Sequence, residues 1–177
     1  GTVIYVPEGV DAEDVAIRTR MNSSSLFNYT LVVTEESSSV TILERQSTGS
    51  ADVEGERFYS GVVEVAAGEN SSVQYGALQN LDDDTYNYTL KRADAGTYSN
   101  VSFVDGNLGS RLTKTEVSTE LNGDGAETKI VGAFFGHDDQ HFDLDSKVWH
   151  RAEHTTADLV TRGVLDDAAR SVYEGVQ

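Results

Sequence analysis

Four histidines lie close together near the end of the sequence, and imidazole is the commonest metal ligand that side chains provide. They are His137, His141, His150 and His154, and five acids stand among them, namely Asp138, Asp139, Asp143, Asp145 and Glu153. Imidazole nitrogens and carboxylate oxygens together suit zinc and other first-row transition metals. Metal binding is therefore the first chemistry that these residue types suggest.

The spacing of the histidines decides whether they can share an ion. His137 and His141 are four residues apart, as are His150 and His154. On a helix both members of a pair lie on one face, whereas on a strand they stand about 13 Å apart. The local sequence favours strand and turn, so neither pair makes a site alone. We therefore predict a structural role and no metal site for these histidines. The alternative is a metal site at His141 and His150, if these two residues meet from adjacent coils of chain.

No motif for catalysis accompanies the histidines. The sequence has no cysteine, which excludes a thiolate nucleophile and thiolate ligation of a cluster within this segment. The turn from Gly123 to Ala126 lacks the Lys-Ser/Thr pair of a phosphate-binding loop, and neither a His-Glu-x-x-His sequence nor a nucleophile elbow occurs. We predict no catalytic residue and no cofactor held by this segment alone.

The charge balance limits the classes of partner. The chain has 30 acidic and 13 basic residues, a net charge of -17. Such a surface repels nucleic acid and anionic membranes, so we expect neither as a partner. The charge fits a salt-adapted organism, because concentrated salt screens repulsion among surface carboxylates. A dedicated acidic binding surface is the alternative.

No apolar run approaches the roughly 20 residues that span a bilayer, and we expect a cytoplasmic protein. Five Asn-x-Ser/Thr sequons, at Asn22, Asn28, Asn70, Asn87 and Asn100, are the one feature that suggests export and glycosylation. A chain this rich in Asn, Ser and Thr also produces sequons by chance. Export therefore stays an alternative.

Alternation of apolar and polar residues dominates the first 150 positions and predicts strands. The clearest strands cover residues 30–34, 40–43, 59–65 and 86–90, which are rich in β-branched and aromatic residues. Residues 166–173 fit a short helix by propensity, but their flanks indicate a turn followed by a strand.

A repeat organises these strands. A small or acidic turn, a polar pair and an apolar strand recur, with the first apolar residues at Val40, Val73, Val101 and Ile130. Each interval holds a second strand, at residues 62–65, 86–90 and 112–117. The longer first interval indicates an insertion at residues 46–56. Two strands per coil of about 28–30 residues predict an all-β fold, a parallel β-helix forming one domain over residues 1–177. An antiparallel sandwich is the alternative architecture, although its strands recur about every 8 to 12 residues.

The most specific motifs lie between Gly123 and Gly175. They are the turn Gly123 to Ala126, the pair Gln140 and His141 with Asp143, the two histidines His150 and His154 before Thr155 and Thr156, and Arg162 to Leu165 before a turn with Arg170. This succession resembles the SufB/SufD family of iron–sulfur cluster assembly proteins.

The sequence resembles the SufD branch more than the SufB branch, because SufB members are expected to carry cysteines that take part in cluster assembly. Two positions depart from the family pattern. Glu153 stands where a proline often precedes the second histidine, and Tyr173 with Glu174 replaces the usual Phe-Asn. These departures bear on the choice of branch more than on the family.

The resemblance implies a right-handed parallel β-helix that serves as a non-catalytic scaffold. It also implies pairing with a SufB-like subunit and a SufC-like ATPase, with the iron–sulfur cluster held transiently at the interface of the full complex. Self-pairing into a homodimer is a further expectation. The cluster ligand and the helical regions of the family are expected outside this sequence, the ligand beyond Gln177, so the chain is expected to be part of a longer protein.

Two other functions fit a β-helix. The first is polysaccharide binding or cleavage, as in pectate-lyase-like proteins, which requires acids, a basic residue and aromatic residues along one exposed strand face. The second is an exported adhesive solenoid, which only the sequons favour. A polysaccharide-binding screen and an intact mass measurement distinguish these functions from the scaffold.

Overall fold

The structure is a computed structural model that describes residues 1–51 and 53–177. These residues form thirteen strands and no helix, which confirms the all-β prediction. The strands are β1 (Thr2–Val6), β2 (Asp11–Met21), β3 (Ser25–Thr34), β4 (Ser39–Thr48), β5 (Arg57–Ala67), β6 (Ser72–Asn80), β7 (Thr85–Ala95), β8 (Asn100–Asn107), β9 (Leu112–Leu121), β10 (Glu127–Gly136), β11 (His141–His150), β12 (Thr156–Leu165) and β13 (Arg170–Val176).

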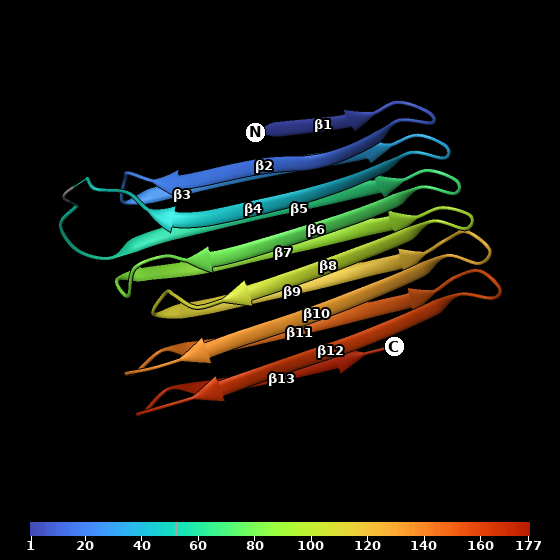
Figure 1. The fold of residues 1–177 in the computed structure, drawn as a ribbon. Coiled ribbons are helices and arrows are strands. Elements are labelled where there is room, and N and C mark those ends of the chain that lie inside the picture. The colour runs from blue at the N-terminus through green and yellow to red at the C-terminus, as the bar shows by residue number, and fades with distance from the viewer. Residues whose placement is uncertain (52) are drawn as a thin grey trace.

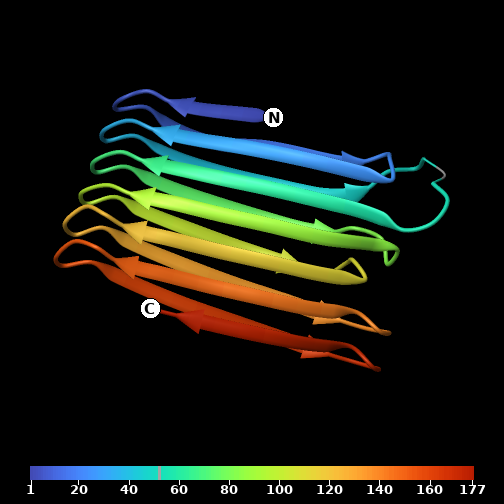
Figure 2. The ribbon, with the colours of Figure 1, turned by 180° about the vertical axis from the view of Figure 1, so that it is seen from behind.

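The strands stack into two parallel sheets that face each other (Figure 1). The odd-numbered strands β1 to β13 form one sheet in chain order, and the even-numbered strands β2 to β12 form the other. Each coil of chain therefore adds one strand to each sheet, which is the topology of a parallel β-helix. The two ends of the chain lie at opposite ends of the stack in both views (Figure 2).

The predicted repeat is confirmed, with one shift in its last member. Val40 pairs with Val73 and Val73 pairs with Val101, as the spacing indicated. The next member is Thr128, which pairs with Val101, whereas Ile130 pairs with Phe103. Thr128 has nearly the shape of valine, and its buried hydroxyl donates a hydrogen bond of 2.9 Å to the carbonyl oxygen of Val101. A polar residue type therefore fills the apolar position.

The insertion lies slightly later than predicted. Strand β4 continues to Thr48, and Gln46 is buried within it, so the longer connection covers residues 49–56. The predicted insertion includes Asp52, which lies outside the described residues. At the other end of the chain, a turn at residues 166–169 precedes β13, which confirms the turn and strand expected there.

The polar pair closes the turn from the odd to the even strand in the first three repeats, whereas Ala126 stands at the serine position of the fourth. The hydroxyls of Ser38, Ser71 and Ser99 donate to the carbonyl oxygens of the residues three positions earlier, at 2.7, 2.8 and 2.7 Å. The residue before each serine has positive φ, a conformation that the turn requires. Short side chains with a hydroxyl therefore recur because they satisfy backbone groups that the turn buries.

The interior of the solenoid changes from apolar to polar along the strands. Near the serine turns it holds Val40, Val73, Val101, Ala95 and Leu121, all almost fully buried. Toward the opposite turns the inward positions become polar, at Glu44, Gln46, Gln79, Asn87, Thr89, Lys91, Asp105, Asn107 and Thr115. Buried polar and charged side chains therefore fill the part of the core that lies away from the serine turns.

Candidate functional site

The polar interior is centred on a buried ion pair. Lys91 on β7 faces inward, and its ammonium group contacts the carboxylate of Asp105 on β8, in the opposite sheet. The side chain of Lys91 is 2 % exposed and that of Asp105 is 10 % exposed. The Lys91 nitrogen also lies 5.2 Å from the ring centroid of Tyr75, a distance at which a cation is attracted by the ring.

A second buried carboxylate, Glu44, lies beside this pair. It accepts hydrogen bonds from the hydroxyls of Tyr75 and Thr19, each at 2.8 Å. Burial raises the pKa of Tyr75, and the negative charge of Glu44 raises this pKa further. Tyr75 therefore stays neutral and donates a hydrogen bond to Glu44, which satisfies part of the buried charge.

The polar side chains leave a small cavity of about 10 Å³ between the sheets. Gln46, Asn87, Lys91, Asp105 and Thr115 are among the residues that line it. A polar cavity of this size has room for about one water molecule. The interior is thus a packed polar network rather than an open binding site.

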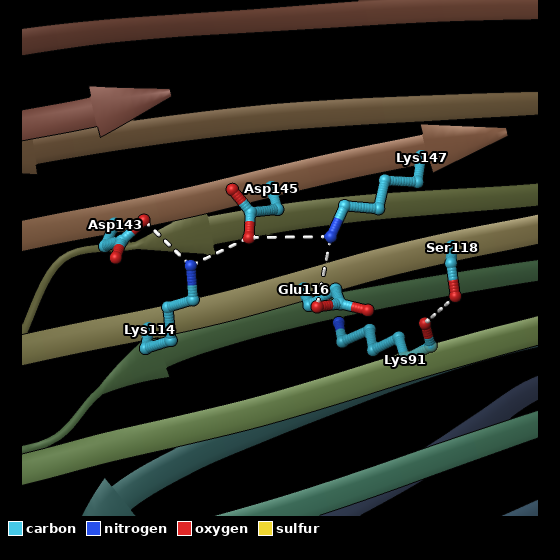
Figure 3. A network of polar contacts seen from close by, with 7 residues as sticks. All are labelled: Lys91, Lys114, Glu116, Ser118, Asp143, Asp145 and Lys147. Carbon is cyan, nitrogen blue, oxygen red and sulfur yellow. Dashed lines mark hydrogen bonds and ion pairs between the residues drawn. The ribbon is translucent and has the colours of Figure 1, made fainter. Parts of the chain in front are cut away.

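The outer face of the odd-numbered sheet carries an ion-pair ladder between β9 and β11 (Figure 3). The ammonium of Lys114 lies 2.9 Å from Asp143 and 2.7 Å from Asp145, and that of Lys147 lies 3.3 Å from Glu116. Partial burial lowers the pKa of Lys114, but its hydrogen bonds to the two aspartates outweigh this effect and raise the pKa overall. The ladder neutralises charge on a face of a strongly acidic protein.

The outer face of the even-numbered sheet carries exposed apolar residues, Leu43 and Val104 among them. A groove of about 620 Å³ runs across β2, β4, β6 and β8, and Leu43, Gly76 and Val104 line it. An adjoining groove is lined by Arg18, Arg20 and Arg45. Exposed apolar surface flanked by charged groups is typical of a contact surface for other macromolecules.

The alternative of a metal site at which His141 and His150 meet does not hold. The two residues are the first and last residues of one strand, β11, and not of adjacent coils. They are nine residue steps apart along the strand, or about 30 Å. This alternative fails because residues 142–148 form one continuous strand, with Phe142, Leu144 and Val148 buried in the core. These two histidines therefore cannot share an ion.

The other two histidines lie in turns at opposite ends of β11. His137 lies in the turn before β11, and its Nδ1 is 2.8 Å from a carboxylate oxygen of Asp138. That hydrogen bond raises the pKa of His137, and the charge of Asp83 adds to the effect. His154, in the turn after β11, is 86 % exposed. Asp83 comes from a distant turn, and no local spacing pointed to it.

Sequence reasoning missed the buried charges of Lys91, Asp105 and Glu44. Their position in the alternating pattern was a usable signal, because Lys91 stands two residues from the inward-facing Thr89 and Ala93. The charge of a lysine usually indicates an outward position.

Among the described residues, no helix exists that could cross a membrane.

Comparison with known proteins places the chain in a family. Residues 17–177 match the family model described as SUF system FeS cluster assembly, SufBD core domain. A SufBD family protein of Staphylococcus saprophyticus is 30 % identical over 179 residues, which cover 99 % of this chain and 38 % of that protein. A SufBD family protein of Mycobacterium leprae is 28 % identical, over 98 % of this chain and 20 % of the relative.

The chain thus spans well under half the length of these relatives. The matched region includes every strand from β3 to β13. The family model covers the coils that carry the buried ion pair, the outer ladder and the histidines. The chain therefore belongs to the SufBD family of iron–sulfur cluster assembly proteins.

Proposed function

We propose that the protein is a SufD-like scaffold subunit, which pairs with a SufB-like subunit and a SufC-like ATPase to assemble iron–sulfur clusters. The observation that carries the proposal is the match to the SufBD core domain over residues 17–177, in a chain without cysteine. Cysteine thiolates are the usual ligands of such clusters, so this segment contributes support and not thiolate ligands.

The proposal includes several finer points. The segment acts as a single rigid domain of a longer protein, holds no cofactor of its own and performs no catalysis. The cluster forms transiently where the subunits of the complex meet, in the cytoplasm. Stacked coils support this role, because each coil is held by the coils on both sides and the whole forms a stiff platform.

The alternative of a polysaccharide-binding or pectate-lyase-like protein rested on the β-helix fold alone. A fold by itself does not specify a function, and the family assignment now gives a more specific basis for one. The adhesive solenoid rested on the sequons, and no other observation favours it. We therefore carry the scaffold proposal alone into experiment.

Reconstitution tests the proposal. The full-length protein is mixed with the SufB-like and SufC-like proteins of the same organism, in about 1 M salt to screen its acidic surface. Native mass spectrometry then gives the composition of the complexes. We expect a stable assembly that contains all three proteins. A protein that stays monomeric, or forms only a homodimer, in the presence of both partners contradicts the proposal.

A further inference from the structure

Two turns from coils that are not neighbours meet at the edge of the solenoid. Asp83 lies in the turn between β6 and β7, whereas His137 and Asp138 lie in the turn between β10 and β11. One ligand atom from each of these three side chains lies within 4.8 Å of the other two. A complete coil, with strands β8 and β9, separates the two turns in the stack.

The turn between β8 and β9 allows this meeting because it is set back into the molecule. A Cβ atom at Gly109 would lie 2.1 Å from the carbonyl oxygen of Leu81, so only glycine fits there. The next residue, Ser110, is fully buried, and its amide donates to the same Leu81 oxygen at 2.8 Å. The middle turn therefore leaves room for the turns on both sides to approach each other.

A buried amide side chain holds the two outer turns in place. Gln140 is 1 % exposed, and its Oε1 accepts a hydrogen bond of 3.0 Å from the backbone amide of His137. Its Nε2 donates to a carboxylate oxygen of Asp83 at 3.3 Å and to the carbonyl oxygen of Ser110 at 3.1 Å. One side chain thus contacts all three turns and fixes the position of the Asp83 carboxylate.

The other two groups are also held in position. Asp138 has a φ of 51°, and its backbone amide donates to a carboxylate oxygen of Asp167 at 3.1 Å. Its own carboxylate lies 2.8 Å from Nδ1 of His137. The imidazole is 38 % exposed at its side chain, so an ion can reach it from solvent. The three groups thus form a positioned set that is open to solvent.

We propose that Asp83, His137 and Asp138 form a binding site for a divalent transition metal ion such as Zn²⁺. One imidazole and two carboxylates are ligand types that suit such ions, and three protein ligands leave room for water to complete the coordination. The imidazole disfavours Ca²⁺ and Mg²⁺, which take oxygen ligands. The ion takes the place of the hydrogen bond between His137 and Asp138, and any proton displaced from the imidazole passes to solvent. The bound ion then links two turns that a complete coil separates.

Metal titration of the full-length protein tests this site. Zn²⁺ is titrated by calorimetry and Co²⁺ by visible absorption, in about 1 M salt so that loose attraction to the acidic surface is screened. The wild type is compared with His137→Ala and Asp83→Asn. We expect each substitution to weaken the affinity of the proposed site for Zn²⁺ at least tenfold. His137→Ala should also remove the visible absorption of Co²⁺ bound at this site.

His154→Ala is the matched control. His154 is also a turn histidine with positive φ and an acidic neighbour, Glu153, at 3.9 Å, but among residues 1–51 and 53–177 no third ligand group joins it. We expect this variant to bind Zn²⁺ within twofold of the wild type. All variants should melt at the wild-type temperature without metal, because the substituted side chains are partly or largely exposed.

The site is overturned if the wild type shows no saturable Zn²⁺ binding, or if His137→Ala binds as tightly as the wild type. An equal loss in His154→Ala also overturns it, because general attraction to the acidic surface then accounts for the binding. The result is independent of the scaffold proposal, since it needs no partner subunit.

Discussion

The ammonium group of Lys91 forms an ion pair with the carboxylate of Asp105 inside the solenoid, joining the odd-numbered sheet to the even-numbered sheet. Both side chains are almost completely removed from water. Buried ion pairs contribute little net stability, but removal of one partner leaves an uncompensated charge in the core. The pair is therefore a sensitive point of the fold.

Replacement of Lys91 by methionine tests this relationship. We expect Lys91→Met to lower the free energy of unfolding by about 3–5 kcal/mol, because Asp105 is left buried and unpaired. The double variant Lys91→Met with Asp105→Leu should be more stable than the single variant. Urea denaturation measures both, and Lys129→Met is the control, because Lys129 and Asp158 form a pair that is more than half exposed. Equal stability of the single and double variants contradicts the expectation.

The outer ladder gives a smaller effect. Asp145 contacts Lys114 at 2.7 Å and Lys147 at 3.9 Å, and its side chain is 11 % exposed. We expect Asp145→Asn to destabilise the protein by about 1–2 kcal/mol, since both lysines lose a charged partner. Asp158→Asn, at an exposed pair, should change stability by less than about 0.5 kcal/mol. A similar loss in the two variants, measured by urea denaturation, would show that burial does not strengthen the ladder.

Replacement by alanine should destabilise the protein to very different extents at two glycines, Gly123 and Gly76. A Cβ at Gly123 would lie 2.0 Å from the amide nitrogen of Thr97, in the backbone of the neighbouring coil. We expect Gly123→Ala to cost about 3 kcal/mol or more, because backbone atoms cannot move aside. A Cβ at Gly76 has the flexible end of the Leu43 side chain as its closest neighbour, at 3.3 Å, and the backbone oxygens of Ile42 and Val104 lie at ordinary contact distances of 3.6 and 4.0 Å. Gly76→Ala should therefore cost less than about 1 kcal/mol. Thermal unfolding ranks the two variants, and the reverse order contradicts the packing of the coils.

The aromatic part of the core provides a fourth test. Phe103 is fully buried, and its ring centroid lies 6.3 Å from that of Tyr75. We expect Phe103→Ala to destabilise the protein by about 3–5 kcal/mol, because it creates a cavity in the interior. Phe135 is 44 % exposed on the outer face, and its replacement by alanine should cost much less. Urea denaturation that shows equal losses would contradict the inward and outward assignment of β8 and β10.

The fold was largely predictable from sequence, because apolar and polar residues alternate along the strands and three successive coils repeat the same serine turn. The repeat shifted at Thr128, because threonine resembles valine in shape but reads as polar in a pattern. The position of Lys91 was predictable from alternation and concealed by its charge. At both positions, the place of the residue in the alternating pattern predicted its burial better than its polarity did.

The arrangement of the histidines was less predictable. Contact between Asp83 and His137 depends on how far the turn at Gly109 and Ser110 sits back from the surface. The depth of this turn depends on the packing of three stacked coils, so it cannot be predicted from a short stretch of sequence. By contrast, the separation of His141 and His150 follows from the uninterrupted strand between them, which the alternation of Phe142 and Leu144 already indicated.

The central claim is that this segment supports cluster assembly without supplying cluster ligands. The most direct test replaces His137, His141, His150 and His154 together by asparagine in the full complex and measures acid-labile sulfide and the cluster absorption per complex. These readouts ignore any ion bound at His137. We expect the wild-type cluster content. An intact complex that assembles no cluster would contradict it.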